Sequence, residues 1–137
     1  MNKEWELETG LIGQVTVEVD EQRTARWLGS GDVDVLATPA VLALAEAAAC
    51  AAVAGRLPRG RTSVGTWAEL EHLAATPVGL AVSASATLLA VDGRTLEFSL
   101  EVTDPGGVVA RGRHRRAIID RARFLQTASE RGSPDGP

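Results

Sequence analysis

The segment T-P-A-V-L-A-L-A-E-A-A-A-C-A-A-V-A-G, Thr38 to Gly55, contains a single charged residue, Glu46. A proline just inside the start and a glycine just past the end are typical of the boundaries of a helix. The hydroxyl of Thr38 can act as the N-cap of the first turn. A helix that is apolar on every side has no face for water. We therefore predict a central helix that is enclosed by a curved sheet, with a second chain to cover what the sheet leaves bare.

The sequence around this helix changes to the period of two that is typical of β-strands. We expect strands over residues 11–19, 63–72, 78–91, 96–102 and 108–120, with residues 24–28 as a continuation of the first. Asp92-Gly93 and the D-P-G-G segment at 104–107 predict tight turns between antiparallel strands. In the strand over 78–91, the even positions are apolar and should face the helix.

The strand over 63–72 also divides into two faces. One face is expected to point toward the helix, which places His72 on the buried side, and it consists of Val64, Thr66, Ala68, Leu70 and His72. The opposite face is mostly polar and should meet solvent; it consists of Ser63, Gly65, Trp67, Glu69 and Glu71.

These patterns predict an α+β fold in which one long central helix is wrapped by a bent antiparallel sheet of about five strands. We expect a single domain over residues 1–125 and a disordered polar tail over residues 126–137. A sheet of this size leaves unpaired edges and an incompletely covered helix. The natural remedy is assembly into a homodimer or a higher oligomer.

The composition excludes several classes of protein. The net charge is −4 and aromatic residues make up 4% of the chain, which argues against a nucleic-acid partner. The central helix is short for a membrane span and carries a carboxylate, so no membrane partner is expected. The single cysteine, Cys50, excludes an internal disulfide and is expected to be a small buried hydrophobe. With no signal peptide in view, we expect a cytoplasmic protein.

Two residues stand out as candidates for chemistry, because a carboxylate and an imidazole are each expected in apolar surroundings. Glu46 is interpreted as a general base or nucleophile, the alternative being a carboxylate that reaches the wet edge of the helix. His72, taken alone, is either a catalytic group or a satisfied core histidine.

Spacing limits how these residues can cooperate. The Cα atoms of Thr38 and Glu46 should lie about 12 Å apart along one helix. They can therefore act together only through something placed between them or through a site shared by two subunits. The free N–H groups at the start of the helix are a candidate oxyanion hole. The two histidines and one cysteine do not form a metal-binding pattern, so no metal and no cofactor are predicted.

Basic residues form two further groups, Arg111, Arg113 and Arg115 on one strand and Arg56, Arg59 and Arg61 after the helix. They are either a solvated surface or a docking patch for a phosphorylated carrier such as coenzyme A.

Three segments of the chain resemble the fluoroacetyl-coenzyme A thioesterase family of hotdog-fold proteins. They are V-L-A-T-P-A-V-L-A-L-A-E-A-A-A-C (residues 35–50), G-T-W-A-E-L-E-H-L-A-A-T-P-V-G (65–79) and G-R-H-R-R-A-I-I (112–119). The resemblance implies that Thr38, Glu46 and His72 are catalytic and that Gly65 and Arg116 border the acyl pocket. The known fluoroacetyl enzyme carries phenylalanines ahead of its catalytic threonine, whereas the region G-S-G-D-V-D-V-L here has none. A different acyl selectivity is therefore expected.

The residues and the resemblance together predict a hydrolase that cleaves a small acyl-CoA thioester, or less favourably an acyl carrier protein thioester. Two alternatives remain open from the sequence. One is a hotdog hydratase or dehydratase that acts on an enoyl thioester. The other is a non-catalytic module that binds an acyl-CoA or a small hydrophobic ligand.

Overall fold

The computed structural model describes residues 5–133. The elements in chain order are β1 (Ile12–Glu18), a 3₁₀ turn η1 (Glu21–Arg23), α1 (Ala25–Leu28), α2 (Thr38–Val53), β2 (Arg61–His72), β3 (Ala81–Asp92), β4 (Thr95–Asp104), β5 (Gly107–Asp120) and α3 (Arg121–Glu130). The strands form one five-stranded antiparallel sheet in the order β1-β3-β4-β5-β2. The predicted α+β architecture, one long helix wrapped by a bent antiparallel sheet of five strands, is confirmed.

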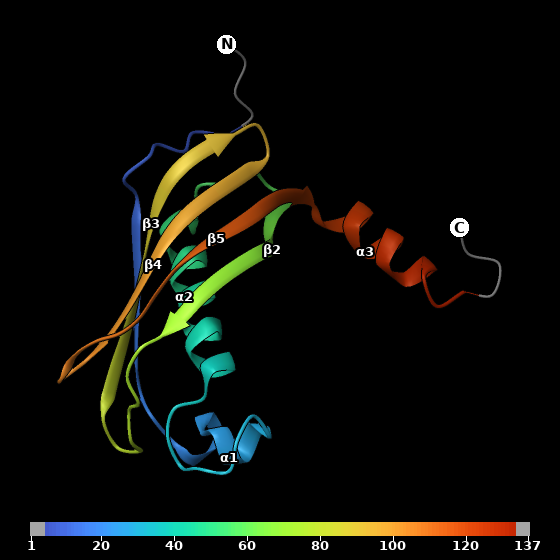
Figure 1. Cartoon of the computed structure of the whole chain (residues 1–137). Helices are drawn as coiled ribbons and strands as arrows, with labels where there is room; N and C mark the ends of the chain where they lie inside the picture. The colour runs from blue at the N-terminus through green and yellow to red at the C-terminus, as the bar shows by residue number, and fades with distance from the viewer. Residues whose placement is uncertain (1–4, 134–137) are drawn as a thin grey trace.

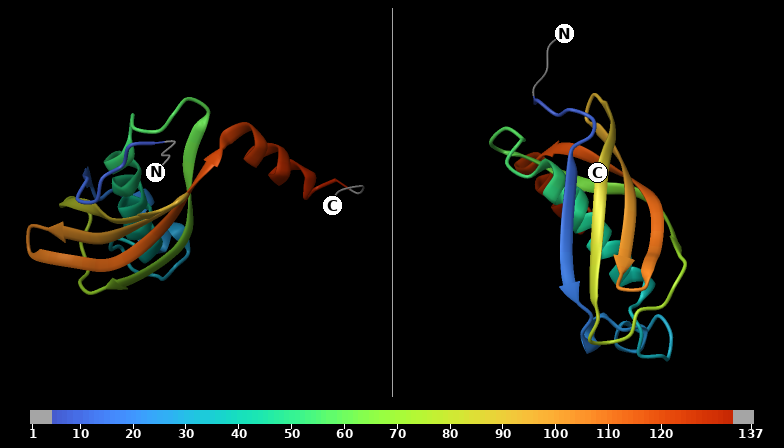
Figure 2. Two further views of the ribbon diagram at one scale, coloured as in Figure 1. Left: turned by 90° about the horizontal axis from the view of Figure 1, so that it is seen from above. Right: turned by 90° about the vertical axis from the view of Figure 1, so that its left-hand side faces the viewer.

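The sheet curves around α2, as the three views of the ribbon show (Figures 1 and 2). Side chains on the concave face are almost fully buried and form the core with the helix. On β3 and β4 they alternate as predicted, and they are Val82, Ala84, Ala86 and Leu88, then Leu96, Phe98, Leu100 and Val102. Val78 and Leu80, which were also expected to face the helix, are exposed because β3 begins only at Ala81.

The helix lies closest to β1, where Gly13 makes the approach possible. A Cβ atom at Gly13 would stand 2.1 Å from the carbonyl oxygen of Ala48 and 2.3 Å from the amide nitrogen of Ala52. Both neighbours are backbone atoms, which cannot turn away as a side chain could. The alanines of α2 and this glycine therefore allow strand and helix to pack backbone to backbone.

One side of α2 is left uncovered in the single chain. Its small residues are exposed there, and they are Ala43, Ala47, Cys50, Ala51 and Ala54. The expectation that Cys50 is buried is therefore wrong for the isolated chain. The sheet reaches only part of the helix circumference, which is why the apolar pattern alone overestimated its enclosure.

Two further expectations are corrected by the structure. Residues 24–28 do not extend the first strand, because Thr24 accepts a hydrogen bond from the amide of Trp27 and caps the short helix α1. Gln126 does not begin a disordered tail, because α3 continues to Glu130; residues 134–137 lie outside the described part of the chain. Helix α3 buries no residue and projects away from the body of the molecule (Figure 1). Among the described residues, no helix is long and apolar enough to cross a membrane.

Replacement of Gly13 by alanine should destabilise the fold, because the new methyl group would meet the backbone of α2. We expect the free energy of unfolding to fall by about 1–3 kcal/mol, the usual cost of overpacking a core. Urea denaturation monitored by circular dichroism measures the change. Gly132→Ala is the matched control, because a Cβ there has nothing within 4 Å. Equal stabilities of the two variants would contradict the close approach.

Candidate active site

Thr38 and His72 meet where α2 begins and β2 ends. The hydroxyl Oγ1 of Thr38 lies 2.8 Å from Nδ1 of His72, within hydrogen-bond distance. Thr38 is not the N-cap that was expected, because Ala37 occupies that position and Thr38 is already helical. Its hydroxyl is thereby free to reach the imidazole. An imidazole nitrogen that accepts from a hydroxyl is suited to take up its proton.

The second ring nitrogen of His72 has different surroundings. Among the described residues, Nε2 of His72 is the one buried side-chain nitrogen or oxygen atom without a hydrogen-bond partner. A buried polar atom without a partner costs about 1–3 kcal/mol. Nδ1 of His72 is thus hydrogen-bonded to Thr38, and Nε2 can form a hydrogen bond with a further group.

Glu46 lies eight residues further along α2 and belongs to a separate cluster. Its Oε2 is 3.5 Å from Nη1 of Arg116 and 3.6 Å from Nε2 of His114. The side chain of Glu46 retains 39% of its exposure, so the dry cavity that the sequence suggested is only partly closed in the single chain. Arg116, in contrast, is 6% exposed. Glu46 supplies the negative charge that faces this buried guanidinium.

Gly65 remains exposed, but the position that its Cβ would take points toward this cluster, which corrects the predicted division of β2 into two faces. The pairing of β2 with β5 shifts between Gly65 and Trp67, where a bulge turns the strand. Before the bulge, Gly65 lies opposite Arg116; after it, Trp67 lies opposite Arg115, and their side chains stack with 4.5 Å between Cζ and the ring. One extra residue therefore reverses which side chains point inward.

A side chain at Gly65 would displace the carboxylate of Glu46. A Cβ there would lie 2.6 Å from Oε2 of Glu46 and 3.1 Å from Cε1 of His114. The missing side chain lets the carboxylate of Glu46 approach the inner face of the sheet.

Arg116 is fixed from several directions. Its Nε donates to Oγ of Ser63 at 2.9 Å, and its Nη2 donates to the carbonyl oxygen of Ser63 at 3.0 Å. Its Nη1 donates to Nε2 of His114 at 3.1 Å. The guanidinium therefore presents a defined edge to Glu46.

His114 was not among the predicted site residues, although the sequence contained a signal for it. The alternation that places Arg111, Arg113 and Arg115 on the outer face of β5 places His114 and Arg116 on the inner face. The pattern does not report that His114 is buried beside an arginine, which is what distinguishes it as a site residue. Burial, together with the neighbouring Arg116 charge, lowers the pKa of His114 below its usual 6.5; the Trp67 carbonyl and Glu46 oppose this shift.

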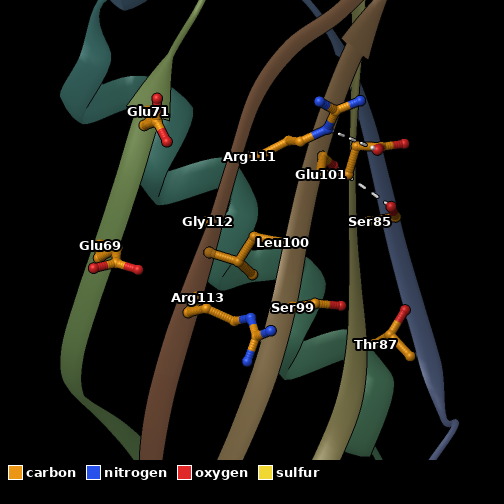
Figure 3. Close-up of a pocket in the computed structure, with 10 residues that line it drawn as sticks. All are labelled: Glu69, Glu71, Ser85, Thr87, Ser99, Leu100, Glu101, Arg111, Gly112 and Arg113. Atoms are coloured by element: carbon orange, nitrogen blue, oxygen red, sulfur yellow. Dashed lines mark hydrogen bonds and ion pairs between the residues drawn. The ribbon is translucent and has the colours of Figure 1, made fainter.

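The outer arginines do not form an isolated basic patch. A hollow of about 500 Å³ on the outer face of the sheet is lined by residues of both charges (Figure 3). Arg111 lies 3.5 Å from Glu101, and Arg115 lies 3.8 Å from Glu97. This arrangement favours the interpretation of the outer arginines as a solvated, internally neutralised surface.

The structure thus brings the predicted residues together in two groups. Thr38 contacts His72, and Glu46 adjoins Gly65 and Arg116. Among the described residues, no hydrogen bond or ion pair joins Glu46 to Thr38 or His72, and no cluster of three potential metal ligands occurs in that part of the chain.

Known proteins share both the sequence and the fold. Residues 19–122 match the family model described as fluoroacetyl-CoA-specific thioesterase. The fluoroacetyl-CoA thioesterase of Streptantibioticus cattleyicolor is 37% identical over 91 residues, which are 66% of this chain and 66% of that protein. A variant of the fluoroacetyl-CoA thioesterase, solved with acetyl-CoA, has a TM-score of 0.88 and 29% identity, covering 92% of this chain and 99% of that chain. A hot-dog-like protein from Thermanaerovibrio acidaminovorans has a TM-score of 0.83 and 25% identity, covering 91% and 93% of the two chains.

The lowered pKa of His114 makes stability depend on pH. Below pH 6.5 the imidazole of His114 becomes protonated in the unfolded chain, whereas in the folded chain it stays neutral to a lower pH. The free energy of unfolding should therefore fall as the pH drops from 6.5 toward the folded pKa, by at most about 1.4 kcal/mol per pH unit from this group. Well above pH 6.5 His114 is neutral in both states, so its contribution to the free energy of unfolding no longer changes with pH.

Urea denaturation of the wild type and His114→Gln at pH 5.5 and pH 7.5 tests this dependence. The variant has no group that titrates at this position, so its loss of stability between the two pH values should be smaller. Identical losses would show that His114 does not resist protonation in the fold.

Proposed function

Because this chain belongs to the fluoroacetyl-CoA-specific thioesterase family, we propose that it hydrolyses the thioester of a small acyl-CoA to the free acid and CoA. Membership of this family makes the chain a thioester hydrolase. The observation that carries the proposal for its site is the 2.8 Å contact between Thr38 and His72 at the start of α2, with Glu46 further along the same helix.

In the proposed reaction, Glu46 either attacks the thioester carbonyl or removes a proton from the water that attacks it. The C–S bond then breaks, and the departing thiolate takes up a proton from His72. If Glu46 has attacked, water hydrolyses the resulting mixed anhydride, which releases the free acid and restores the carboxylate. If water has attacked, the free acid is released directly. His72 serves as the general acid and base, since its Nδ1 lies within hydrogen-bond distance of the hydroxyl of Thr38. Thr38 and the free N–H groups of the first helical turn position the nucleophile and stabilise the oxyanion.

Arg116 and Gly65 are proposed to border the acyl pocket. They adjoin Glu46, and Arg116 supplies a fixed positive charge beside the carboxylate. Because Thr38 and Glu46 are eight residues apart on one helix, the thioester would lie between them or the site would combine residues of two subunits.

Assembly into a homodimer or a higher oligomer is supported by surfaces that the single chain leaves without a partner. Strand β2 forms one edge of the sheet over 12 residues, and α2 exposes a row of small apolar residues. Edge strands with free N–H and C=O groups readily pair with another chain. A cytoplasmic location is consistent with the single cysteine, because thiols stay reduced there.

We also propose an acyl selectivity different from that for fluoroacetyl. The loop over residues 29–34 that leads to α2 contains no aromatic residue. Beside it, a cleft of about 430 Å³ is lined by Leu28, Pro39, Ala40, Ala43 and Leu44, together with Gln22 and Arg23. No aromatic side chain is among the described residues that line this cleft, which supports a selectivity different from that of a pocket with an aromatic gate.

Replacement of either proposed acid–base residue should abolish most turnover. Glu46→Gln and His72→Ala are each expected to lower kcat by about 10²-fold or more, the usual scale for such groups. Thiol release from a panel of acyl-CoA substrates, followed with Ellman's reagent, measures this. Ser99→Ala on the outer face of the sheet is the matched control and should retain full activity.

The same panel separates the alternatives. A hydratase would add water to an enoyl-CoA without releasing thiol, and a binding module would bind acyl-CoA without changing it. Full thiol release by a folded Glu46→Gln protein would rule out the proposed role of this carboxylate.

The proposed assembly is tested on the bare side of α2. Ala47→Glu places a charge at an exposed position, so the single chain should fold, whereas a subunit packed there would be displaced. Light scattering after size exclusion should find a dimer or larger for the wild type and a monomer for the variant. Ala81→Glu, at the exposed start of β3, should assemble like the wild type. A monomeric wild-type protein would disprove the proposal.

A further inference from the structure

We propose that His114 is a positioning residue for the thioesterase site: its neutral imidazole fixes Arg116, and Arg116 in turn orients the carboxylate of Glu46. The inference rests on the proposed function. His114 touches no reacting atom in this scheme and acts only through Arg116.

The first support is the way in which His114 is held. Its side chain is 1% exposed on the inner face of β5. Nδ1 lies 2.8 Å from the carbonyl oxygen of Trp67, directly after the bulge in β2. The ring of Phe98 packs on it with 6.3 Å between ring centroids. The imidazole therefore has one fixed orientation, set by two neighbouring strands.

The second support is the tautomer that these neighbours require. A carbonyl oxygen can only accept, so Nδ1 of His114 must carry the proton that it donates to Trp67. A guanidinium can only donate, so Nε2 must be unprotonated to accept from Nη1 of Arg116 at 3.1 Å. Both conditions are met by one neutral tautomer, with Nδ1 protonated and Nε2 free.

The hydrogen bonds of Arg116 to Ser63 and His114 leave one N–H of Nη1 directed at Glu46. Nε and Nη2 donate to Ser63, and one N–H of Nη1 donates a hydrogen bond to Nε2 of His114. The other proton of Nη1 is then left for Oε2 of Glu46, 3.5 Å away. Without the acceptor on His114, Nη1 would lose the partner that fixes its direction, although Ser63 would still retain the guanidinium.

Charge selects the neutral form of this histidine. The charged groups that face it are Arg116, which opposes a second positive charge, and Glu46, whose Oε2 lies 3.6 Å from Nε2. A protonated His114 would turn an N–H toward the guanidinium and would compete with Arg116 for the carboxylate. The arrangement therefore requires an acceptor at this position, which a leucine cannot supply and a glutamine can.

The test is a double-mutant cycle between His114 and Arg116, measured by thiol release. His114→Leu should lower kcat by about tenfold or more, the scale of a small misplacement of catalytic groups, with a smaller change in KM. In an Arg116→Gln background the same substitution should change kcat by less than about twofold, because the route through Arg116 is already absent. His114→Gln should recover most of the lost kcat. The matched control, Leu88→Ala, removes an equally buried side chain from β3 and should have the same effect on kcat in both backgrounds.

Equal losses of kcat in the two backgrounds, or full kcat in His114→Leu, would overturn the inference. If His114→Leu fails to fold, ¹⁵N NMR of the wild-type imidazoles decides the matter. An unprotonated Nε2 at pH 7, together with a kcat of His114→Gln close to that of the wild type, supports the inference. A protonated Nε2, or a kcat of His114→Gln lowered about tenfold or more, overturns it. A wild-type protein that releases no thiol from any acyl-CoA would refute the proposed function, an outcome distinct from a failed cycle in an active enzyme.

Discussion

The structure depends on placing a charged pair at the inner face of an otherwise apolar fold. Arg116 is almost completely buried, and a buried guanidinium without a counter-charge is strongly destabilising. Glu46 provides that charge from α2, and Ser63 and His114 accept three further hydrogen bonds from the guanidinium. The pair links α2 to strand β5. The position of Arg116 therefore also sets where the carboxylate of Glu46 lies relative to the sheet.

The architecture could be predicted from the sequence because its signals are local and repeated. Val82 to Leu88 and Leu96 to Val102 alternate without interruption, and the turn at Asp92-Gly93 fixes how these strands pair. The run of alanines in α2, bounded by Pro39 and Gly55, indicated a helix that must pack closely. Where every local preference agrees with the global fold, a single sequence is sufficient.

The candidate site was predicted less completely, because its geometry depends on irregular features. The bulge at Gly65 reverses the inward face of β2, and strict alternation cannot reveal an inserted residue. The contact of Thr38 with His72 joins residues 34 positions apart, so local capping rules assigned the hydroxyl to the wrong partner. His114 was visible only as a member of the inner face of β5, next to an arginine whose burial no sequence pattern reported.

The position of α2 relative to the sheet explains why the apolar side of the helix and the carboxylate of Glu46 are both exposed in the single chain. The helix packs mainly on β1 and β3 and makes fewer contacts with β2, so the inner face of β2 is left more open. Glu46 meets the buried Arg116 of β5 beside this opening. A more central helix would exclude water from the carboxylate but would also close the space that a thioester requires. The bare side of α2, the open edge of β2 and the half-exposed Glu46 lie along the same boundary of the molecule. A partner subunit that covered this boundary would bury the exposed apolar residues of α2 and would also exclude water from the carboxylate. Such an assembly would couple the stability of the interface to the chemistry of the site.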